Sequence, residues 1–373
     1  MVDYCRMNNT NTKAAENAVI DINPIPYLTW TWLKINKDSV SYDFALTENN
    51  GSDIQLPSNV SVSSGKSVKT QLSEPESSIG EEATKLITAA TEGKIYTFEK
   101  TKEETKPLII RIKADSNSAT CNIIHMKEGA EGKVIIVYES PANSGAELLS
   151  GAVTKVYAED DSKLEITKVQ LFGKNVNQID DTQVVCGERA KVGLIQVVLG
   201  GSHTDTGFHA TLAGYQSKFT SDTAYLCREN QYIDMNQTVV HTGKKTDCDM
   251  KTDGTVKDNA TKTYRGTIDM RKGCSGSTGN EMETTLLLSP KALVKAAPII
   301  LCGEDDIAAE HGSTIGKLSP EMLFYMNSRG IDQKTAEELL TRAKITAAAA
   351  NIPDETIREE IEQWIASSQS SSQ

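Results

Sequence analysis

The sequence is poor in aromatic residues, in paired cysteines and in positive charge, and each shortage excludes a class of protein. Aromatic residues make up 5% of the 373 residues, which is little for the core of a large globular enzyme. The seven cysteines are scattered and no CxxC pair occurs, so the sequence encodes neither a zinc ribbon nor a disulfide framework. A formal net charge of −12 argues against binding to nucleic acid or to an anionic membrane surface.

Long apolar runs are missing as well. No stretch of the sequence approaches the ~20 apolar residues that are needed to cross a bilayer. Residues 1–18 lack the charged and then apolar pattern of a secretion signal. Because the cysteines also form no pairing pattern, a reducing cytoplasmic location is expected.

The chain does contain a long central stretch of short runs rich in Ile, Val and Thr, from Lys106 to about Cys302. Turn-forming residues separate these runs, and almost no helical periodicity interrupts them. This pattern excludes a parallel sheet wound with alternating helices and leaves a doubled sandwich, a barrel or a stacked β-helix. Small β-branched residues in rungs that can be repeated favour the β-helix, which is expected to occupy residues 99–303.

The region before this core is mixed. Within residues 1–98, the stretch 57–80 is rich in Ser, Gly, Pro and Glu and predicts a flexible surface loop. Apolar residues at helical spacing predict one short helix at Glu81–Glu92. Residues 1–98 are therefore expected to form a mixed, partly helical N-terminal region.

Residues 304–367 are expected to form a helical C-terminal domain of three helices. The first begins at Ser319, which is followed by a proline, and ends at Gly330. Asp332 can cap the second helix, and the third begins at Asp354. The serine- and glutamine-rich residues 368–373 predict a disordered tail.

Two motifs resemble ligand-binding loops but lack residues that those loops require. Gly312–Lys317 (GSTIGK) has three residues between its glycines where a phosphate loop has four, and Leu318 stands where that loop has a hydroxyl. The acidic stretch around Cys248 lacks the glycine and the glutamate of a calcium loop at their required positions. Neither nucleotide nor calcium binding is expected.

His203 and His209 lie six residues apart, which matches no common metal-binding spacing. They are interpreted as polar residues on a turn between strands. Three cysteines lie in or beside strand-like runs and are expected to be buried apolar fillers, namely Cys121, Cys186 and Cys227.

His311 stands in a different context. It lies within Glu304–Lys317 (EDDIAAEHGSTIGK), which is expected to be a loop between the last strand and the first C-terminal helix. Loops held by a rigid scaffold often carry function, and a neutral imidazole can bind iron or zinc. Spacing alone leaves two interpretations open: a metal ligand, or a histidine that is hydrogen-bonded in a domain hinge.

The run from Asp305 to Ile331 (DDIAAEHGSTIGKLSPEMLFYMNSRGI) resembles the C-terminal signature of the SufB/SufD family of iron–sulfur cluster assembly proteins. Val256–Ile268 (VKDNATKTYRGTI), Thr285–Pro298 and Trp30–Lys34 are similar to further segments of that family. The resemblance covers roughly residues 25–365. It implies a helical N-terminal region, a right-handed parallel β-helix core and a helical C-terminal domain.

The resemblance also implies partners and a cargo. A SufC-type ABC ATPase docks on the C-terminal helices of the family, and the candidate docking residues here are Phe324, Tyr325, Arg329 and Gly330. A SufB chain or a second copy of this chain pairs through the β core. A transient iron–sulfur cluster is shared with that partner subunit, and this chain alone binds none tightly.

Departures from the SufB pattern favour a SufD-like member, which is a non-catalytic scaffold subunit. In SufB, a cysteine late in the core and a glutamate after the signature histidine are implicated in cluster assembly. Here the corresponding segment reads Asn280–Thr285 (NEMETT), and Gly312 follows His311. The resemblance therefore implies that His311, with Glu310 beside it, faces a partner's cysteine across the subunit interface and binds metal transiently.

Cys302 and Cys274 are weaker candidates for that site, because they are near it in sequence but do not match the SufB cysteine. Two alternative functions remain open. One is a structural β-helix adaptor in which His311 is only a hinge residue. The other is a carbohydrate-active β-helix enzyme, which requires paired acidic residues or a basic catalytic residue on one face and usually has a secretion signal.

Overall fold

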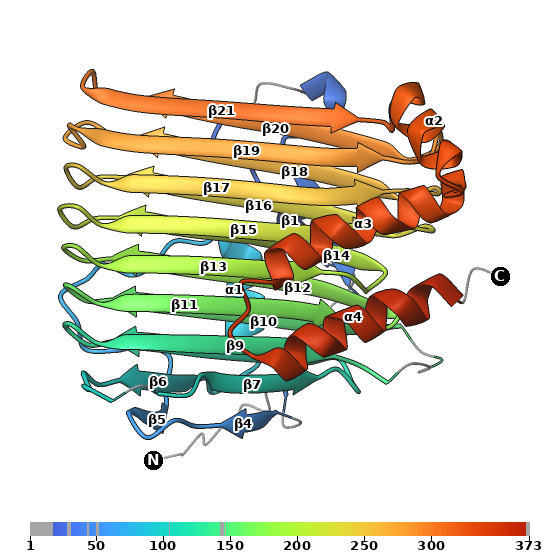
Figure 1. The fold of residues 1–373 in the computed structure, drawn as a ribbon. Helices are drawn as coiled ribbons and strands as arrows, with labels where there is room; N and C mark the ends of the chain where they lie inside the picture. Colours follow the sequence, from blue (N-terminus) through green and yellow to red (C-terminus); the bar gives the residue numbers. More distant parts are fainter. Residues whose placement is uncertain are drawn as a thin grey trace, which may run out of the picture.

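The computed structural model describes residues 18–27, 31–42, 45–49, 52–103, 105–141, 145 and 147–370. Within this part, the chain winds into a stack of parallel strands that alternate between two sheets (Figure 1). Most strands pair with the strand two positions further along the chain, as β8 (Ser118–Met126) does with β10 (Leu148–Ala158). This confirms the mainly β fold with a parallel β-helix core.

One sheet, which we call the rear sheet, lies behind the other in Figure 1. Besides β8 and β10 it contains β3 (Thr47–Glu48), β5 (Val60–Ser64), β6 (Lys94–Phe98), β12 (Val176–Cys186), β14 (His203–Leu212), β16 (Tyr232–His241), β18 (Thr261–Met270) and β20 (Leu293–Cys302). The front sheet contains β4 (Asp53–Gln55), β7 (Leu108–Lys113), β9 (Glu131–Glu139), β11 (Lys163–Leu171), β13 (Lys191–Val198), β15 (Lys218–Cys227), β17 (Asp247–Val256), β19 (Ser277–Leu287) and β21 (Ile307–Gly316). Only β4 and β5, at the N-terminal end of these two described sheets, pair antiparallel with their neighbours.

The core lies between the two sheets. Side chains alternate along each strand, so every second residue points into this space, where Ile, Val, Leu, Ala and Met predominate. Two buried ion pairs interrupt the apolar packing. Lys168 Nζ lies 2.6 Å from Asp180 Oδ1, and Lys262 Nζ lies 2.6 Å from Glu283 Oε1. The charges of these four side chains are thus matched in pairs, as burial in a medium of low polarity requires.

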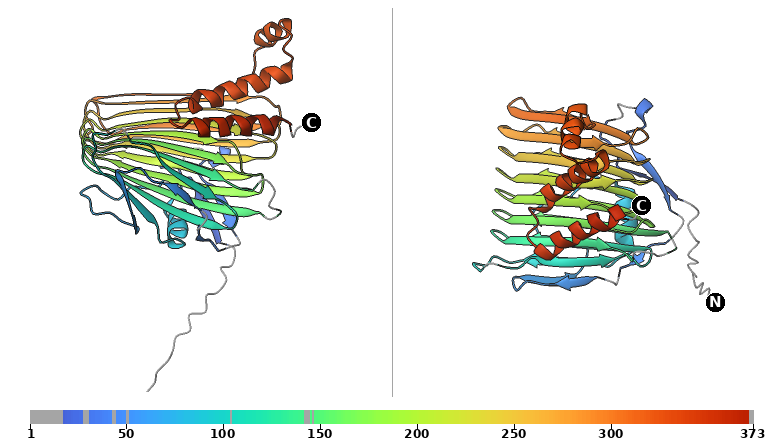
Figure 2. Two further views of the ribbon diagram at one scale, coloured as in Figure 1. Left: turned by 60° about the horizontal axis from the view of Figure 1, so that its bottom comes forward. Right: turned by 45° about the vertical axis from the view of Figure 1, so that its right-hand side comes forward.

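Helices cover the outer face of the front sheet (Figure 1). Isoleucines of α3 (Gln333–Ala349) and α4 (Glu355–Ser370) pack on outward-facing aliphatic residues of β7 to β15. Arg111 Nη2 of β7 lies 2.6 Å from Glu360 Oε1 of α4, which fixes the helix on the sheet. The remaining C-terminal helix, α2 (Pro320–Ser328), projects from the end of the stack (Figure 2) and has no buried residue.

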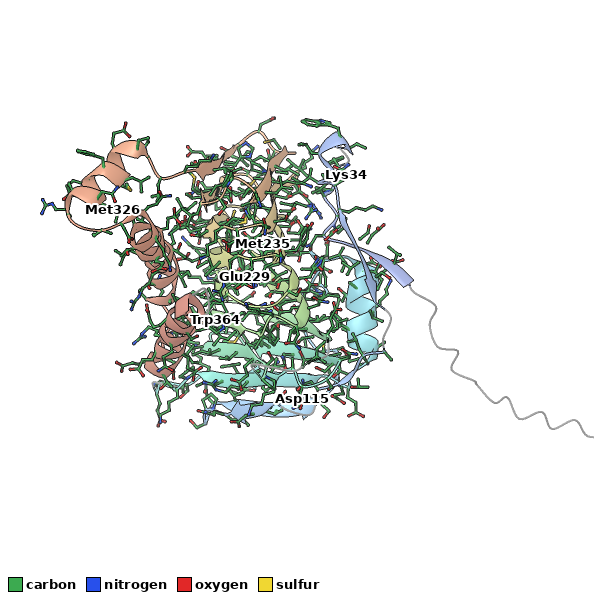
Figure 3. The ribbon with its side chains drawn as sticks, turned by 90° about the vertical axis from the view of Figure 1, so that its right-hand side faces the viewer. Lys34, Asp115, Glu229, Met235, Met326 and Trp364 are labelled. Carbon is green, nitrogen blue, oxygen red and sulfur yellow. The ribbon has the colours of Figure 1, made fainter. Side chains whose placement is uncertain are left out.

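The outer face of the rear sheet is covered by the N-terminal segment, which runs along the opposite side from the C-terminal helices (Figure 3). This segment contains the hairpin of β1 (Ala18–Ile22) and β2 (Asp38–Tyr42), a 3₁₀ turn (η1, Thr31–Leu33) and α1 (Glu81–Ala89). The molecule is therefore layered as N-terminal segment, rear sheet, core, front sheet and helices.

The predicted helix signals are confirmed. Ser319 Oγ accepts a hydrogen bond from Met322 N at 3.1 Å, and Asp332 Oδ1 accepts one from Thr335 N at 2.8 Å. Gly330 follows the end of α2 with φ +81°, a conformation that favours glycine. The helix expected at Glu81–Glu92 is α1. Burial of Cys121, Cys186 and Cys227 is confirmed too, and this burial raises the pKa of each thiol.

The expectation of a loop at His311 is wrong, because His311 lies within strand β21. This strand pairs with β19 over its whole length, although charged residues and two glycines gave its sequence the character of a loop. Such residues are tolerated because β21 is the last strand of the stack and most of its residues are exposed. β21, together with β5 and β6, adds strands to the stack outside the predicted core limits of 99–303.

Three smaller expectations also differ from the structure. Residues 57–80 are not all surface loop, because β5 lies within them and Ser78 is buried. His203 and His209 lie on strand β14 rather than on a turn. Gly207 lies between them, where β14 and β16 approach each other closely: a Cβ there would meet Asn236 O at 2.1 Å. Helix α4 extends to residue 370, so part of the expected tail is helical, while Trp30 and residues 371–373 lie outside the described residues.

A buried histidine generates a prediction about acid stability. His241 is fully buried in β16, with ring nitrogens 2.7 Å from Thr246 Oγ1 and 3.2 Å from Cys248 Sγ. Burial lowers its pKa from 6.5 to about 4. Between these values the unfolded chain binds more protons, so His241 makes stability fall as the pH falls from 6.5 to 4, by at most about 1.4 kcal/mol per pH unit.

We expect His241→Gln to show a weaker decrease of melting temperature across this pH window than the wild-type chain. Val239→Ala is the matched control, because it removes buried volume from the same strand without a titrating group. It should lower the melting temperature but keep the wild-type pH dependence. Equal pH slopes for His241→Gln and the wild-type chain, measured by thermal unfolding, would contradict the assignment.

Candidate functional site

The candidate site lies at the C-terminal end of the stack, where the last turn is formed by β20 and β21. Among the described strands, β20 pairs only with β18, and β21 pairs only with β19. The other edge of each strand therefore presents backbone N–H and C=O groups without a strand partner in the described chain. Such edges invite pairing with another chain.

His311 points toward the interior side of this open end. On β21, Ile307 and Ala309 pack against the core, so the alternation of side chains places His311 on the same inner face. The imidazole is nevertheless exposed, because the part of the chain that the structure describes has no further turn of the stack to cover it. His311 is paired in register with Glu281 of β19, one turn below.

Glu310 belongs to the opposite face. It neighbours His311 in sequence and is exposed, but the alternation directs its side chain outward, in register with Asn280. The structure therefore does not bring Glu310 and His311 together on one surface.

The two cysteine candidates lie away from His311. Cys302 is the last residue of β20 and is exposed, and Cys274 lies in the turn between β18 and β19 and is buried, which raises the pKa of its thiol. Both lie near the turn that leads from β20 into β21, which begins at Ile307. His311 lies four positions after Ile307, which at the rise of a β-strand is roughly 13 Å.

The inward-facing glutamates of β19 were not among the site residues predicted from the sequence. Glu281 and Glu283 are both completely buried and lie in register with His311 and Ser313. They are two residues apart in a strand, so the spacing in Asn280–Thr285 already places them on one face. That spacing was the available signal.

Glu283 is fully matched by its surroundings. Its carboxylate accepts hydrogen bonds from Lys262 Nζ at 2.6 Å and from Ser313 Oγ at 2.5 Å. Burial alone would raise the pKa of Glu283, but the Lys262 ammonium and the hydrogen bonds outweigh it and lower that pKa. Glu283 is therefore charged, and its carboxylate is engaged in the ion pair and hydrogen bonds that hold this part of the core.

Glu281 is different. The Tyr264 hydroxyl faces this carboxyl and acts to lower its pKa, but no described residue donates a hydrogen bond of ordinary geometry to either carboxylate oxygen. Burial raises its pKa to about 8, so the free carboxyl is mostly protonated at neutral pH. The Glu281 carboxyl and the exposed His311 imidazole lie in register on neighbouring strands. Together they offer one hard and one borderline ligand, a combination that iron accepts.

A second feature of this end is the exposed aromatic surface of α2. Phe324 is 76% exposed and Tyr325 59% exposed. The guanidinium of Arg329 lies 5.4 Å from the centre of the Tyr325 ring, and Gly330 follows it at the helix end. The predicted docking residues therefore lie together on a projecting element, and exposed large apolar side chains of this kind often mark interaction surfaces.

Within the part of the chain that the structure describes, no helix combines the length and the apolar character needed to span a membrane.

Comparison with known proteins gives a consistent result. The sequence model of the family described as "SUF system FeS cluster assembly, SufBD core domain" matches residues 110–344. The chain is 29% identical to the iron–sulfur cluster assembly protein SufD of Bacillus subtilis over 139 residues, which are 37% of this chain and 32% of that protein. It is 25% identical to SufB of the same bacterium over 207 residues, which are 56% of this chain and 44% of SufB.

A SufBD family protein of Staphylococcus saprophyticus is 24% identical over 233 residues, which are 62% of this chain and 50% of that protein. The chain thus aligns with about a third to a half of the length of these relatives. The matched residues include most of the β stack and reach into α3.

The raised pKa of Glu281 predicts a pH-dependent effect of Glu281→Gln. Between pH 4.5 and about 8 the folded chain holds a proton that the unfolded chain releases, so the wild-type chain loses stability as the pH rises. The glutamine removes this loss, by at most about 1.4 kcal/mol per pH unit. We expect the melting temperature of Glu281→Gln, relative to wild type, to be higher at pH 8 than at pH 5.

Glu283→Gln is the matched control from the same strand. It leaves the Lys262 ammonium buried without its carboxylate partner, so it should lower the melting temperature at both pH values. An effect of Glu281→Gln that is the same at pH 5 and pH 8 would contradict the assignment of a neutral carboxyl.

Proposed function

The chain belongs to the SufBD family of SUF-system iron–sulfur cluster assembly proteins, and on this premise we propose that it is a SufD-like, non-catalytic scaffold subunit. It pairs with a SufB chain or with a second copy of itself in a cytoplasmic complex, and a transient iron–sulfur cluster is the cargo. The observation that carries this proposal is the placement of His311. Its imidazole is exposed on the inner side of an open β-stack end, in register with the uncommitted carboxyl of Glu281.

The open end supports pairing through the β core. β20 and β21 are each ten residues long, and their outer edges have no strand partner in the described chain. Inward-facing Ile315 of β21 is 46% exposed because no described strand is stacked on it. Long, exposed strand edges with apolar side chains favour pairing with another chain, and a partner that extends both sheets covers these groups.

The ligands at this end suit a cluster that is built and then released. His311 supplies an imidazole, and Glu281 supplies a carboxylate once its proton is released on metal binding; both accept iron without binding it as strongly as a set of thiolates does. A partner's thiolate completes the set across the interface. Because the ligands are divided between two chains, separation of the chains removes part of the set and releases the cargo.

The position of the phosphate-loop-like segment supports the assignment of ATP hydrolysis to a partner. Gly312–Lys317 lies mostly within β21, whereas a phosphate loop connects a strand to a helix whose N-terminus binds the phosphates. In the proposed complex a SufC-type ATPase docks on α2 through Phe324 and Tyr325. Their exposure on a helix without buried residues supports this assignment.

The cluster proposal is tested by His311→Ala in the complex reconstituted with its partner under anaerobic conditions. We expect the iron and sulfide bound per complex to fall about tenfold or more, the scale seen when a metal site loses an important group. The exposed position of His311 means that the melting temperature should change little.

Glu310→Gln is the matched control for this experiment, because Glu310 is adjacent in sequence but faces outward. It should retain the wild-type content of iron and sulfide. Unchanged iron and sulfide in His311→Ala would sink the scaffold proposal in favour of a structural adaptor with no part in cluster building.

ATPase docking is tested by changing both Phe324 and Tyr325 to Asp. Loss of an aromatic anchor costs about 2 kcal/mol or more, so affinity for a SufC-type ATPase should fall at least about thirtyfold. Leu86→Asp on α1 places the same charge at an exposed apolar position on the other side of the molecule and should leave the affinity unchanged. Equal affinities for the double variant and the wild-type chain, measured by calorimetry, would exclude α2 as the docking element.

A further inference from the structure

A set of possible metal ligands lies far from the open end, between the rear sheet and the N-terminal hairpin. His203 and Asp205 are alternate residues at the start of β14, so both point to the same face. Phe208 of this strand packs in the core, which places His203 and Asp205 on the outer face. Asp38, the first residue of β2, lies over them from the hairpin.

The distances between the three side chains match those between ligands of a single ion. His203 Nε2 lies 3.4 Å from Asp38 Oδ2 and 3.2 Å from Asp205 Oδ2. All three donor atoms lie within 4.8 Å of one another. Ligands that are each about 2.0–2.2 Å from a metal ion are separated by roughly 3–4 Å, and both distances from His203 Nε2 fall in this range.

The burial of Asp205 is the second, independent observation. Its side chain is completely buried, and no described residue donates a hydrogen bond of ordinary geometry to either of its oxygens; its ion-pair partner is His203 Nε2, 3.2 Å away. Asp38 Oδ2 and His203 Nε2 are buried atoms without a hydrogen-bond partner in the described chain as well. A buried carboxylate that lacks a donor is costly, so a group of three such atoms facing one another points to a cation between them.

Neighbouring charges do not supply that cation. Asp234, paired in register with Asp205, is occupied by Arg265 and also accepts a hydrogen bond from Asn23 Nδ2 at 2.6 Å. The Arg265 Nε–H is directed elsewhere, to a backbone carbonyl of the N-terminal segment. Arg265 is thereby matched with Asp234, and the ion-pair partner of both Asp38 and Asp205 is the single imidazole of His203.

Protonation of His203 does not resolve this arrangement fully. A single Nε2–H can donate along one direction, whereas the two carboxylates lie at similar distances from that nitrogen. One dication bound to a neutral imidazole and two carboxylates satisfies all three groups and gives a net charge of zero. The second oxygen of Asp38 is already held, because it accepts a hydrogen bond from Ser39 N at 2.8 Å.

We propose that Asp38, His203 and Asp205 bind one divalent first-row transition metal ion, which clamps the β1–β2 hairpin onto the rear sheet. One imidazole nitrogen and two carboxylate oxygens suit Mn²⁺, Fe²⁺ or Zn²⁺, and the absence of sulfur from this set disfavours Cu⁺. The His203 side chain is 30% exposed and that of Asp38 21% exposed, so an ion can enter from solvent. The site is separate from His311 and does not depend on the proposed scaffold function.

The binding test uses Mn²⁺ alone, followed by electron paramagnetic resonance, because thiols compete weakly for this ion. We expect the full chain to bind one equivalent at this site and Zn²⁺ to displace it. Asp205→Asn keeps the shape but removes the charge, and Asp38→Asn does the same at the partly exposed ligand. Each should weaken binding at this site about a hundredfold.

Two control variants make the result specific. His209→Gln alters another histidine on the same face of β14 and should keep the wild-type affinity. His311→Ala should also keep it, even where it abolishes cluster assembly, so the two proposals fail independently. No Mn²⁺ binding by the wild-type chain, or equal binding by the wild-type chain and a folded Asp38→Asn variant, would overturn the metal site and leave an ion pair in its place.

The clamp is tested by hydrogen exchange of residues 38–42 with Mn²⁺ or with a chelator. Binding should slow exchange in β2 of the wild-type chain, because Asp38 is the ligand that the hairpin contributes. The ion should have no such effect in Asp38→Asn. Exchange in β2 that is unaffected by the ion in the wild-type chain, despite one bound equivalent, would refute the clamp.

Discussion

The whole molecule depends on the in-register parallel pairing of successive turns. Each strand satisfies its backbone groups through the strands above and below it, and the register decides which side chains are stacked. This constraint places Glu281 below His311, Glu283 below Ser313 and Asp205 beside Asp234. A shift by one residue would move every inward side chain to the outer face, exposing the apolar core and burying unmatched charges.

The general architecture could be predicted because it follows from local composition. Runs rich in Ile, Val and Thr without helical periodicity identify the β core, and Ser319, Asp332 and Gly330 mark helix ends through hydrogen bonds to residues nearby in sequence. The loop expected around His311 failed for a local reason as well. At the last strand of a stack, exposed polar residues and glycine are compatible with a β-strand, so composition no longer distinguishes strand from loop.

The candidate sites depend on information that composition does not contain. Glu281 becomes a candidate ligand because β19 pairs with β21, which carries His311. Asp38 becomes one because its hairpin lies across β14, which carries His203. His203 was assigned to a turn because glycines surround it, whereas Gly207 is needed where the chain passes close to Asn236. The family resemblance identified His311 as a candidate, but it could not reveal that Glu310 faces away from it.

The two ends of the stack differ in a way that limits assembly. At the N-terminal end, β4 and β5 have three and five residues and run antiparallel to their neighbours, whereas β20 and β21 at the other end have ten residues each. The long edges of β20 and β21 can pair over only a few residues with the short strands β4 and β5 of another copy. Head-to-tail growth into filaments is therefore disfavoured, and two long ends that meet form a closed pair with no long edge left to recruit a third chain.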